Sequence, residues 1–252
     1  MAKSKGIPFI YHTTEAGSNE TVTGFKFSIL NEFQFGGNYK GVMIAGVGGG
    51  SCNGSSGNGE EDREKKASTL EGLLISGLAG GSDGPVKGAI ISGMLAYNRS
   101  TVKGVSAGGI VNLSKDKVDG VAFGGLCNRV EGKVNGKALS LGINSIKENL
   151  NGVAFGGIAN YIEKSAKGMI LSWGVNYVKE AFAGFAYGLV GNRAHHNEGN
   201  VFQMGFANHV TEYHNDGFVI QIGLYNHVGN REVPLINVVG LKSLFKKKEK
   251  QR

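Results

Sequence analysis

The chain has 252 residues with 43 glycines but only 3 prolines, and 40% of its residues are hydrophobic. This composition excludes collagen, and the hydrophobic content is too high for a disordered linker. The formal net charge is +7, and six basic residues against one acidic residue in 241–252 account for +5 of it. The nearly neutral body predicts no specific nucleic-acid partner. The basic tail is most simply a solvated end, with contact to anionic lipid or another acidic partner as the alternative.

The start of the chain carries basic residues. Residues 1–17 contain no long apolar stretch followed by a small-residue cleavage site, so no secretory signal is visible. No run approaches the roughly 18 apolar residues of a membrane-spanning helix. The sequence therefore predicts a cytoplasmic protein, with a membrane or cell-surface location as the alternative.

Two weak copies of a glycine-anchored unit come first in the chain. Gly24 opens GFKFSILN, and Gly41 opens GVMIAGVGG. The interval from Gly41 to the next anchoring glycine, Gly72, is almost twice the interval between the later ones, so one unit carries an insertion nearly as long as itself. The inserted stretch is rich in glycine and serine and then charged. We predict that it forms a disordered surface insertion at about 48–67.

From Gly72 onward the unit recurs with a strict 16-residue period, without insertion or deletion. An apolar residue stands two positions before each anchoring glycine, and from the third unit an asparagine stands eight positions after it. The glycines are Gly72, Gly88, Gly104, Gly120, Gly136, Gly152, Gly168 and Gly184. The asparagines are Asn112, Asn128, Asn144, Asn160, Asn176, Asn192 and Asn208.

The last units are less regular. NVFQMGFAN keeps the register, GFVIQIGLYN slips by two residues, and VPLINVVG is predicted to be an irregular cap that closes the last layer. We therefore expect a single β-repeat domain over residues 1–240, followed by the basic tail 241–252.

A typical unit, GVAFGGLCNRVEGKVN, lacks a 3.6-residue apolar stripe and contains several glycines. Short strands joined at glycine corners are therefore predicted, and the fold class is all-β. In a β-solenoid each unit forms one coil, and the asparagines stack into a ladder of hydrogen-bonded amides. The alternative is an antiparallel β-meander that closes into a barrel. The constant unit length favours the solenoid, because a coil cannot change length without disturbing both neighbours.

The two faces of each strand are harder to assign. Within one coil we expect a corner at Gly124 and Gly125 and these inward side chains: Val121, Phe123, Leu126, Asn128, Val130 and Val134. The first half of most units is apolar at both odd and even positions, as in residues 169–175. One apolar set would then face outwards, which predicts a protein partner, self-association or a lipid surface at that flank.

The units GLLISGLAG, GAIISGMLA and GVAFGGLCN resemble those of uncharacterised bacterial surface-repeat proteins, which read like Gly-Val-Gln-Ile-Ser-Gly-Leu-Phe-Asn. The resemblance covers about residues 20–240, and the glutamine of that unit is kept at Gln203 and Gln221. VIQIGLYN followed by VPLINV is similar to the end of such arrays. The resemblance implies an exported repeat protein and supplies no activity.

No catalytic and no cofactor-binding residues are predicted. The glycine-rich stretches GVGGGSCNG and GLAGGSDG lack the GK[ST] sequence that binds phosphate, and no GxSxG or HExxH motif is present. Acidic residues fall mostly in polar turns, where solvation explains them.

Histidines form the one cluster with possible chemistry, since five of six lie within 195–227. His209 and His227 both follow a repeat asparagine, so a solenoid stacks them about 5 Å apart, a separation that suits two ligands of one metal ion. His214 is the third candidate ligand. The alternative is an ordinary outward position for large polar groups, because the same slot in earlier units holds Tyr161, Tyr177 and Arg193.

These patterns predict a non-enzymatic structural or interaction protein that presents an extended β-repeat surface and self-associates or associates with membranes. One alternative is a membrane-embedded β-barrel. Another is a metal-binding protein or enzyme that uses the C-terminal histidines.

Overall fold

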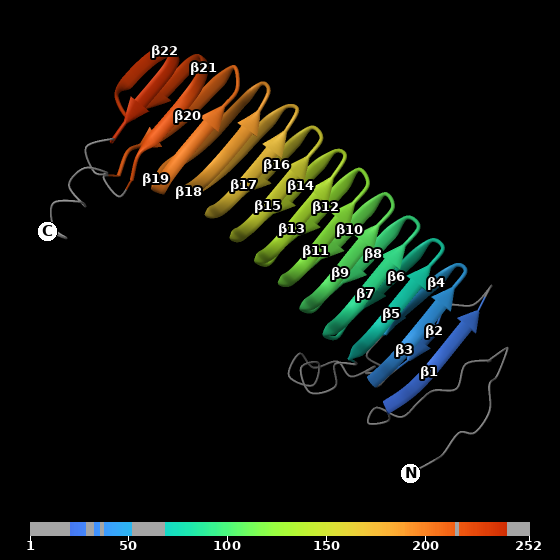
Figure 1. Cartoon of the computed structure of the whole chain (residues 1–252). Helices are drawn as coiled ribbons and strands as arrows, with labels where there is room; N and C mark the ends of the chain where they lie inside the picture. Colours follow the sequence, from blue (N-terminus) through green and yellow to red (C-terminus); the bar gives the residue numbers. More distant parts are fainter. Residues whose placement is uncertain (1–20, 29–32, 36–37, 52–68, 215–216, 241–252) are drawn as a thin grey trace, which may run out of the picture.

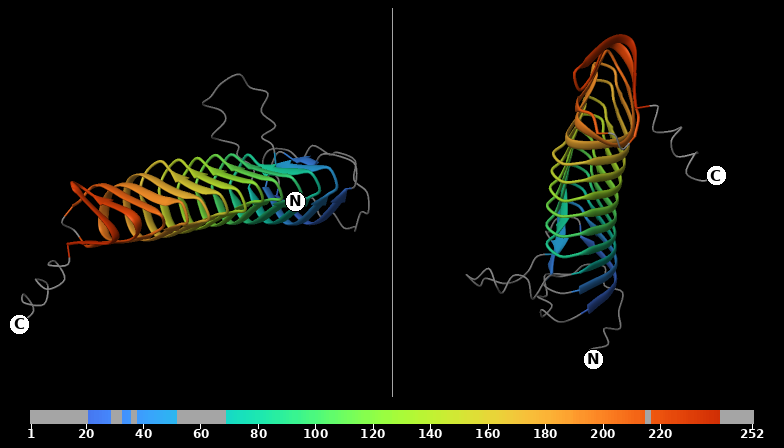
Figure 2. Two further views of the ribbon diagram at one scale, coloured as in Figure 1. Left: turned by 90° about the horizontal axis from the view of Figure 1, so that it is seen from above. Right: turned by 90° about the vertical axis from the view of Figure 1, so that its left-hand side faces the viewer.

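The protein is an all-β solenoid. A computed structural model describes residues 21–28, 33–35, 38–51, 69–214 and 217–240. These residues form 22 strands and no α-helix. Figures 1 and 2 show the coils stacked along one axis into a rod, with β1 at one end and β22 at the other.

Each coil contains a longer strand and a shorter strand. The longer strands are β1 (Thr21–Ser28), β3 (Asn38–Ala45), β5 (Leu70–Ser76), β7 (Val86–Ser92), β9 (Val102–Gly108), β11 (Val118–Gly124), β13 (Val134–Ser140), β15 (Leu150–Gly156) and β17 (Ala166–Ser172). The shorter strands are β2 (Phe33–Phe35), β4 (Gly48–Ser51), β6 (Ala79–Ser82), β8 (Leu95–Asn98), β10 (Val111–Ser114), β12 (Cys127–Val130), β14 (Ile143–Ile146) and β16 (Ala159–Ile162). The last strands are β18 (Val175–Gly188), β19 (Gly191–Met204), β20 (Ala207–Glu212), β21 (Val219–Val228) and β22 (Arg231–Val239).

Successive coils pair in parallel and in register. Gly120 of β11 lies beside Gly136 of β13, and Asn128 of β12 lies beside Asn144 of β14. The predicted solenoid is therefore confirmed. The alternative of an antiparallel meander closing into a barrel is wrong, because the described repeat strands are joined by parallel ladders between one coil and the next.

One coil shows how the repeat unit is used. β11 takes 7 residues, residues 125–126 form a corner, β12 takes 4 residues, and residues 131–133 lead back to the next long strand. The predicted corner at Gly124 and Gly125 is thus displaced by one residue, since Gly124 still belongs to β11.

The core corrects the predicted inward set for the first strand of the coil. Val130, Val134 and Asn128 are fully buried as expected. Ala122 is also fully buried, whereas Leu126 is 65% exposed and Val121 and Phe123 are only partly buried.

The reason for this correction is space inside the coil. Nδ2 of Asn128 donates a hydrogen bond to the carbonyl oxygen of Ala122 across the coil at 3.1 Å, so the asparagine fills the room opposite Ala122. At this level of the long strand the small Ala122 therefore points inward, whereas the larger Val121 and Phe123 point outward.

The anchoring glycines explain the strict period. Gly136 has a φ of 134°, in the region that side chains disfavour, and a Cβ there would lie 2.1 Å from the carbonyl oxygen of Gly120. A residue with a side chain at this point would push the neighbouring coil away. The period is kept because each glycine must lie against the glycine of the coil before it.

The irregular parts lie near the two ends. β3 pairs with β5, and β4 with β6, on either side of the predicted insertion. Residues 48–51 of that insertion form β4, and its remaining residues lie outside the described ones, as does the tail 241–252. At the other end, Asn208 lies beside Asn226 with the two-residue slip, and β22 returns antiparallel to β21 as the last strand.

Candidate functional site

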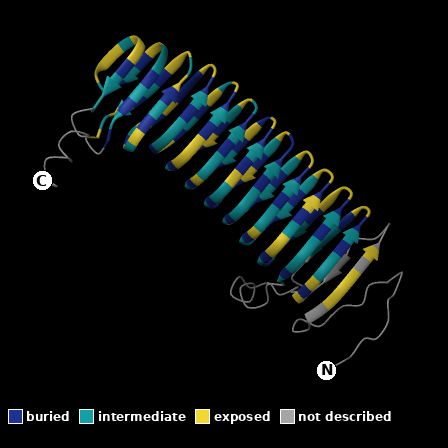
Figure 3. Cartoon of the chain, viewed as in Figure 1, coloured by how far each residue is buried: buried dark blue, intermediate teal, exposed yellow. Residues whose placement is uncertain are grey.

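One edge of the rod carries a line of large apolar side chains. At the corner after the long strand, each coil from β3 onward exposes at least one such residue, and the corner of Leu189 and Val190 exposes two. We call this line the apolar edge; it consists of Val47, Leu78, Met94, Ile110, Leu126, Leu141, Ile158, Trp173, Val190, Phe206 and Leu224. Figure 3 shows the exposed turns aligned along one side of the stack.

The apolar edge persists although the corner sequence changes. Gly125 precedes Leu126, but in the next coil the order is reversed, and Leu141 precedes Gly142. Both leucines are strongly exposed, at 65% and 69%. One large apolar side chain therefore projects from the corner whichever of the two positions holds the glycine.

Apolar residues also flank the edge on both sides. On the long strands the outward position nearest the corner includes Ile91, 42% exposed, and on the short strands the first outward position includes Ile143 and Val175, at 42% and 47%. From β3 to β21 no charged residue occupies the corner or either flanking position. The apolar surface is therefore continuous along the described rod.

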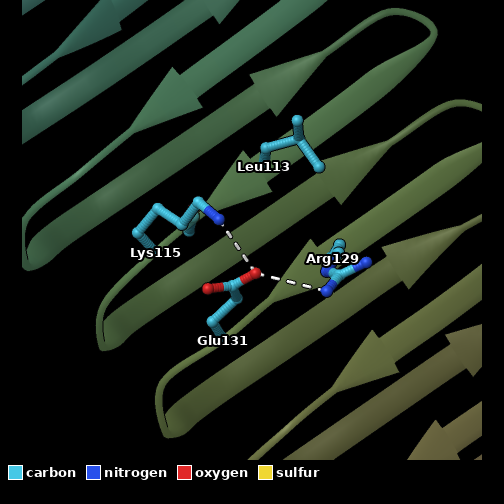
Figure 4. Close-up of a pocket in the computed structure, with 5 residues that line it drawn as sticks. Leu113, Lys115, Arg129 and Glu131 are labelled. Carbon is cyan, nitrogen blue, oxygen red and sulfur yellow. Dashed lines mark hydrogen bonds and ion pairs between the residues drawn. The ribbon is translucent and has the colours of Figure 1, made fainter.

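The opposite corner is polar. In seven consecutive coils, the position that follows the short-strand segment is charged: Asp83, Arg99, Lys115, Glu131, Lys147, Glu163 and Lys179. Glu131 accepts a hydrogen bond from Lys115 at 3.0 Å and lies 3.3 Å from nitrogens of both Arg129 and Lys147. Figure 4 shows Lys115 and Arg129 converging on this carboxylate.

The neighbouring cations favour the ionised form of the Glu131 side chain. The hydrogen bond from Lys115, supported by that from Lys147, lowers the pKa of Glu131 below its ordinary value. The shallow surface hollow here is lined by Leu113, Ser114 and the same ion pairs. A carboxylate held ionised on an exposed edge links adjacent coils and keeps this corner solvated.

The predicted asparagine ladder is present in full. Nδ2 of each asparagine from Asn112 to Asn192 donates to Oδ1 of the asparagine in the next coil at 2.8 to 3.0 Å, and Asn208 extends the series to Asn226 at 2.9 Å. The ladder residues are 0–3% exposed. They hold neighbouring coils together from inside and are not accessible to a ligand.

The structure brings two of the three candidate metal ligands together. The rings of His209 and His227 stack with centroids 4.2 Å apart and planes inclined by 12°. They continue a column in which Tyr161 stacks on Tyr177 at 5.2 Å and the Arg193 guanidinium lies 5.8 Å from the Tyr177 ring centroid. The position is therefore an outward slot filled by flat groups.

His214 has other neighbours. Its ring meets His196 edge-on at 4.9 Å, and His195 lies 3.7 Å from a carboxylate oxygen of Glu212. Within the described ranges, no group of three histidine, cysteine or acidic side chains has the geometry to hold a metal ion.

Sequence reasoning missed one partner of the stacked histidines. Glu232, on β22, accepts a hydrogen bond from the hydroxyl of Tyr225 at 2.8 Å and lies 3.1 Å from Nδ1 of His227. These two hydrogen bonds, that from Tyr225 first, lower the pKa of Glu232. Burial, followed by the nearby charges of His227 and Arg193, lowers the pKa of His209.

Sequence reasoning also missed the apolar edge as a single line of residues. The signal was present, because each corner dipeptide contains at least one large apolar residue. The period is hidden because Leu141-Gly142 and Trp173-Gly174 reverse the usual Gly-X order and Leu189-Val190 contains no glycine. No helix in the described part of the chain is long and apolar enough to cross a lipid bilayer.

The fold and the surface define a repeat protein of the β-solenoid class, with a buried asparagine ladder, one apolar edge and one polar edge. Comparison with protein-family models, curated proteins and solved structures finds no match for this chain. The fold is compatible with a structural or interaction role.

Proposed function

We propose that the protein is a non-enzymatic interaction rod that docks through its apolar edge. The observation that carries this proposal is the presence of at least one exposed large apolar residue at the same corner of every coil from β3 to β21. Adjacent coils are about 4.8 Å apart, so the eleven side chains form a line about 50 Å long.

The amount of exposed apolar surface supports docking. Eleven half-exposed side chains present on the order of 1,000 Å², beyond the roughly 300–600 Å² of the largest patch on an ordinary monomer. Folding gains nothing from leaving these groups in water, and the polar residues at the opposite corner show that this scaffold accepts charged residues at a turn. One edge is apolar and the opposite edge is charged, and this difference supports the apolar edge as the contact surface.

The proposal is tested with two matched double variants in the same two coils. The edge variant carries Leu126→Gln and Leu141→Gln, and the control carries Lys133→Gln and Glu148→Gln at the polar side, which leaves the net charge unchanged. All four side chains are at least partly exposed, so thermal midpoints should stay close to that of the wild type.

Extracts of cells that express each form are separated by density and size without detergent. We expect the wild type and the control in an assembled or sedimenting fraction, and the edge variant shifted to the free monomer. A wild-type chain found only as a free monomer, and indistinguishable from the edge variant, would contradict the proposal.

A further inference from the structure

We propose that the surface on which the apolar edge docks is a lipid bilayer with anionic headgroups, and that the rod lies lengthwise on it with the edge inserted between acyl chains. This inference rests on the proposed function and names its partner.

The shape of the edge favours lipid over a rigid partner. Leu126, Leu141 and Ile158 are 65%, 69% and 62% exposed, as expected for side chains that project from a convex corner. Apolar groups continue on both sides of that corner, with Ile91 on a long strand and Val175 on a short strand, at 42% and 47%. A rigid partner could cover both flanks only with a matching groove about 50 Å long. A second copy would touch the edge along a line, whereas acyl chains close around it from both sides.

On the short-strand side, the residues next to the apolar flank have the composition of a membrane interface. The next outward position of the short strand lies two residues farther from the corner, about 6.6 Å along the strand, which matches the roughly 5–10 Å insertion depth of interfacial segments. Its large side chains are mostly aromatic or basic, and none is acidic: Tyr97, Leu113, Arg129, Tyr161, Tyr177, Arg193, His209 and His227. Tyrosine and arginine at this level can contact ester groups and phosphates.

The distribution of charge along the chain favours an anionic bilayer over a neutral one. The tail 241–252 carries +5 of the total charge of +7, and it follows the last described residue at one end of the rod. Each basic residue near an anionic surface contributes to binding, while a neutral surface attracts none of them. The edge supplies insertion, and the tail supplies the preference for anionic lipid.

The apolar edge contains a natural fluorescent reporter of insertion. Trp173 is the only tryptophan, it belongs to the apolar edge, and it is 66% exposed. Its emission shifts to shorter wavelength when the indole leaves water, and brominated acyl chains quench it only if it enters the hydrocarbon region.

The test titrates the full-length protein with vesicles of phosphatidylcholine alone and of phosphatidylcholine mixed with phosphatidylglycerol. Wild type should bind the mixed vesicles with a blue shift of Trp173 and quenching by brominated lipid. The variant with Leu126→Gln and Leu141→Gln should bind about 100-fold more weakly, about tenfold for each lost apolar contact. The control with Lys133→Gln and Glu148→Gln should bind like the wild type.

A third variant tests the tail in the full chain. Changing Lys246, Lys247 and Lys248 to glutamate should weaken binding to the mixed vesicles and leave the quenching of the bound fraction unchanged.

Three results would overturn the inference. They are the absence of vesicle binding, binding that the edge variant retains in full, and an edge-dependent dimer in sedimentation experiments that does not bind vesicles. The last result leaves the interaction role intact and replaces its partner with a second copy. A protein that is a free monomer in cell extracts and also does not bind vesicles would contradict both proposals.

Discussion

Asn144 donates a hydrogen bond from Nδ2 to Oδ1 of Asn160, one coil farther along the rod, at 2.9 Å. Asn144 also accepts from Asn128 at 3.0 Å and donates to the carbonyl oxygen of Phe155 at 2.6 Å. One buried side chain therefore joins three consecutive coils. An uncharged amide can make all three bonds because it has two N–H donors and a carbonyl acceptor.

The ladder predicts a large effect of Asn144→Ala. The change removes three hydrogen bonds and leaves groups on Asn128, Asn160 and Phe155 without a partner inside the core. We expect a loss of about 2–4 kcal/mol in the free energy of unfolding, since each orphaned buried group costs about 1–3 kcal/mol. The matched control is Asn151→Ala on the outer face, where the bond to Asn135 is exposed and 3.3 Å long. Denaturant titration should show less than about 0.5 kcal/mol for the control; equal losses at the two sites would refute a structural ladder.

The glycine column predicts that Gly136→Ala is not tolerated. A Cβ at Gly136 meets the carbonyl oxygen of Gly120 at 2.1 Å, and the φ of 134° is strained for alanine. We expect a cost of at least about 3 kcal/mol, or failure to fold. The control is Gly229→Ala, at a φ of 59° with no atom within 4 Å of the added Cβ, which should cost about 1–2 kcal/mol. Chemical denaturation checks the difference, and similar costs would show that crowding between coils is unimportant.

Side-chain volume inside the coil predicts the outcome of Ala138→Leu. This inward column holds large side chains in some coils, such as Leu74, Ile90 and Ile170, but Ala138 is fully buried directly between Ala122 and Ala154 of the adjacent coils. Leucine at position 138 therefore overfills the space, at a cost of about 1–3 kcal/mol. Lys137→Leu, on the outer face of the same strand, is the control and should change stability little. A stabilised Ala138→Leu protein, measured by thermal or denaturant unfolding, would mean that the interior contains unfilled space.

The stacked histidines predict that stability falls with acid. His209 on β20 faces His227 on β21, Arg193 on β19 and, beyond His227, Glu232 on β22, and its pKa is lowered from the ordinary 6.5, mainly by burial. The unfolded chain therefore binds the proton more readily than the folded one. The stabilisation is complete above pH 6.5 and is lost as the pH falls from there through the lowered folded pKa.

The thermal midpoint, followed from neutral pH down to about pH 5, measures this effect. Glu232, whose pKa is also lowered, loses its contribution as the pH falls below its ordinary value of 4.5, outside the tested window. The variant His209→Asn should flatten the profile between pH 7 and about 5. His195→Asn, at a half-exposed histidine outside the stack, should leave the wild-type slope. Identical slopes in the wild type and His209→Asn would contradict the prediction.

Much of the fold could be predicted from local spacing. Gly120 and Gly136, or Asn128 and Asn144, are one repeat unit apart and become direct neighbours because each coil advances the chain by one strand spacing. A repeat unit of constant length therefore favours this stacking over an antiparallel meander. The same reasoning placed His209 beside His227 and recognised the slip between Asn208 and Asn226.

The orientation of the long strand could not be predicted in the same way. Val121 and Ala122 are both apolar, so the pattern alone does not say which faces inward. The choice depends on packing against the facing strand, from which Asn128 reaches across the coil to the carbonyl oxygen of Ala122. That contact joins two strands of one coil, so it cannot be deduced from the repeat period.

The sequence by itself determined the all-β class, the length of the repeat unit and the spacing of the asparagines, and it favoured parallel coils over an antiparallel meander, because these follow from equal spacing along one chain. Only the tertiary structure decided which apolar set is buried, that the corner residues form one continuous edge, and that Glu232 lies against His227. Those features depend on how much space two facing strands leave between them and on where the antiparallel return of β22 passes, and both arise only when separate segments pack together.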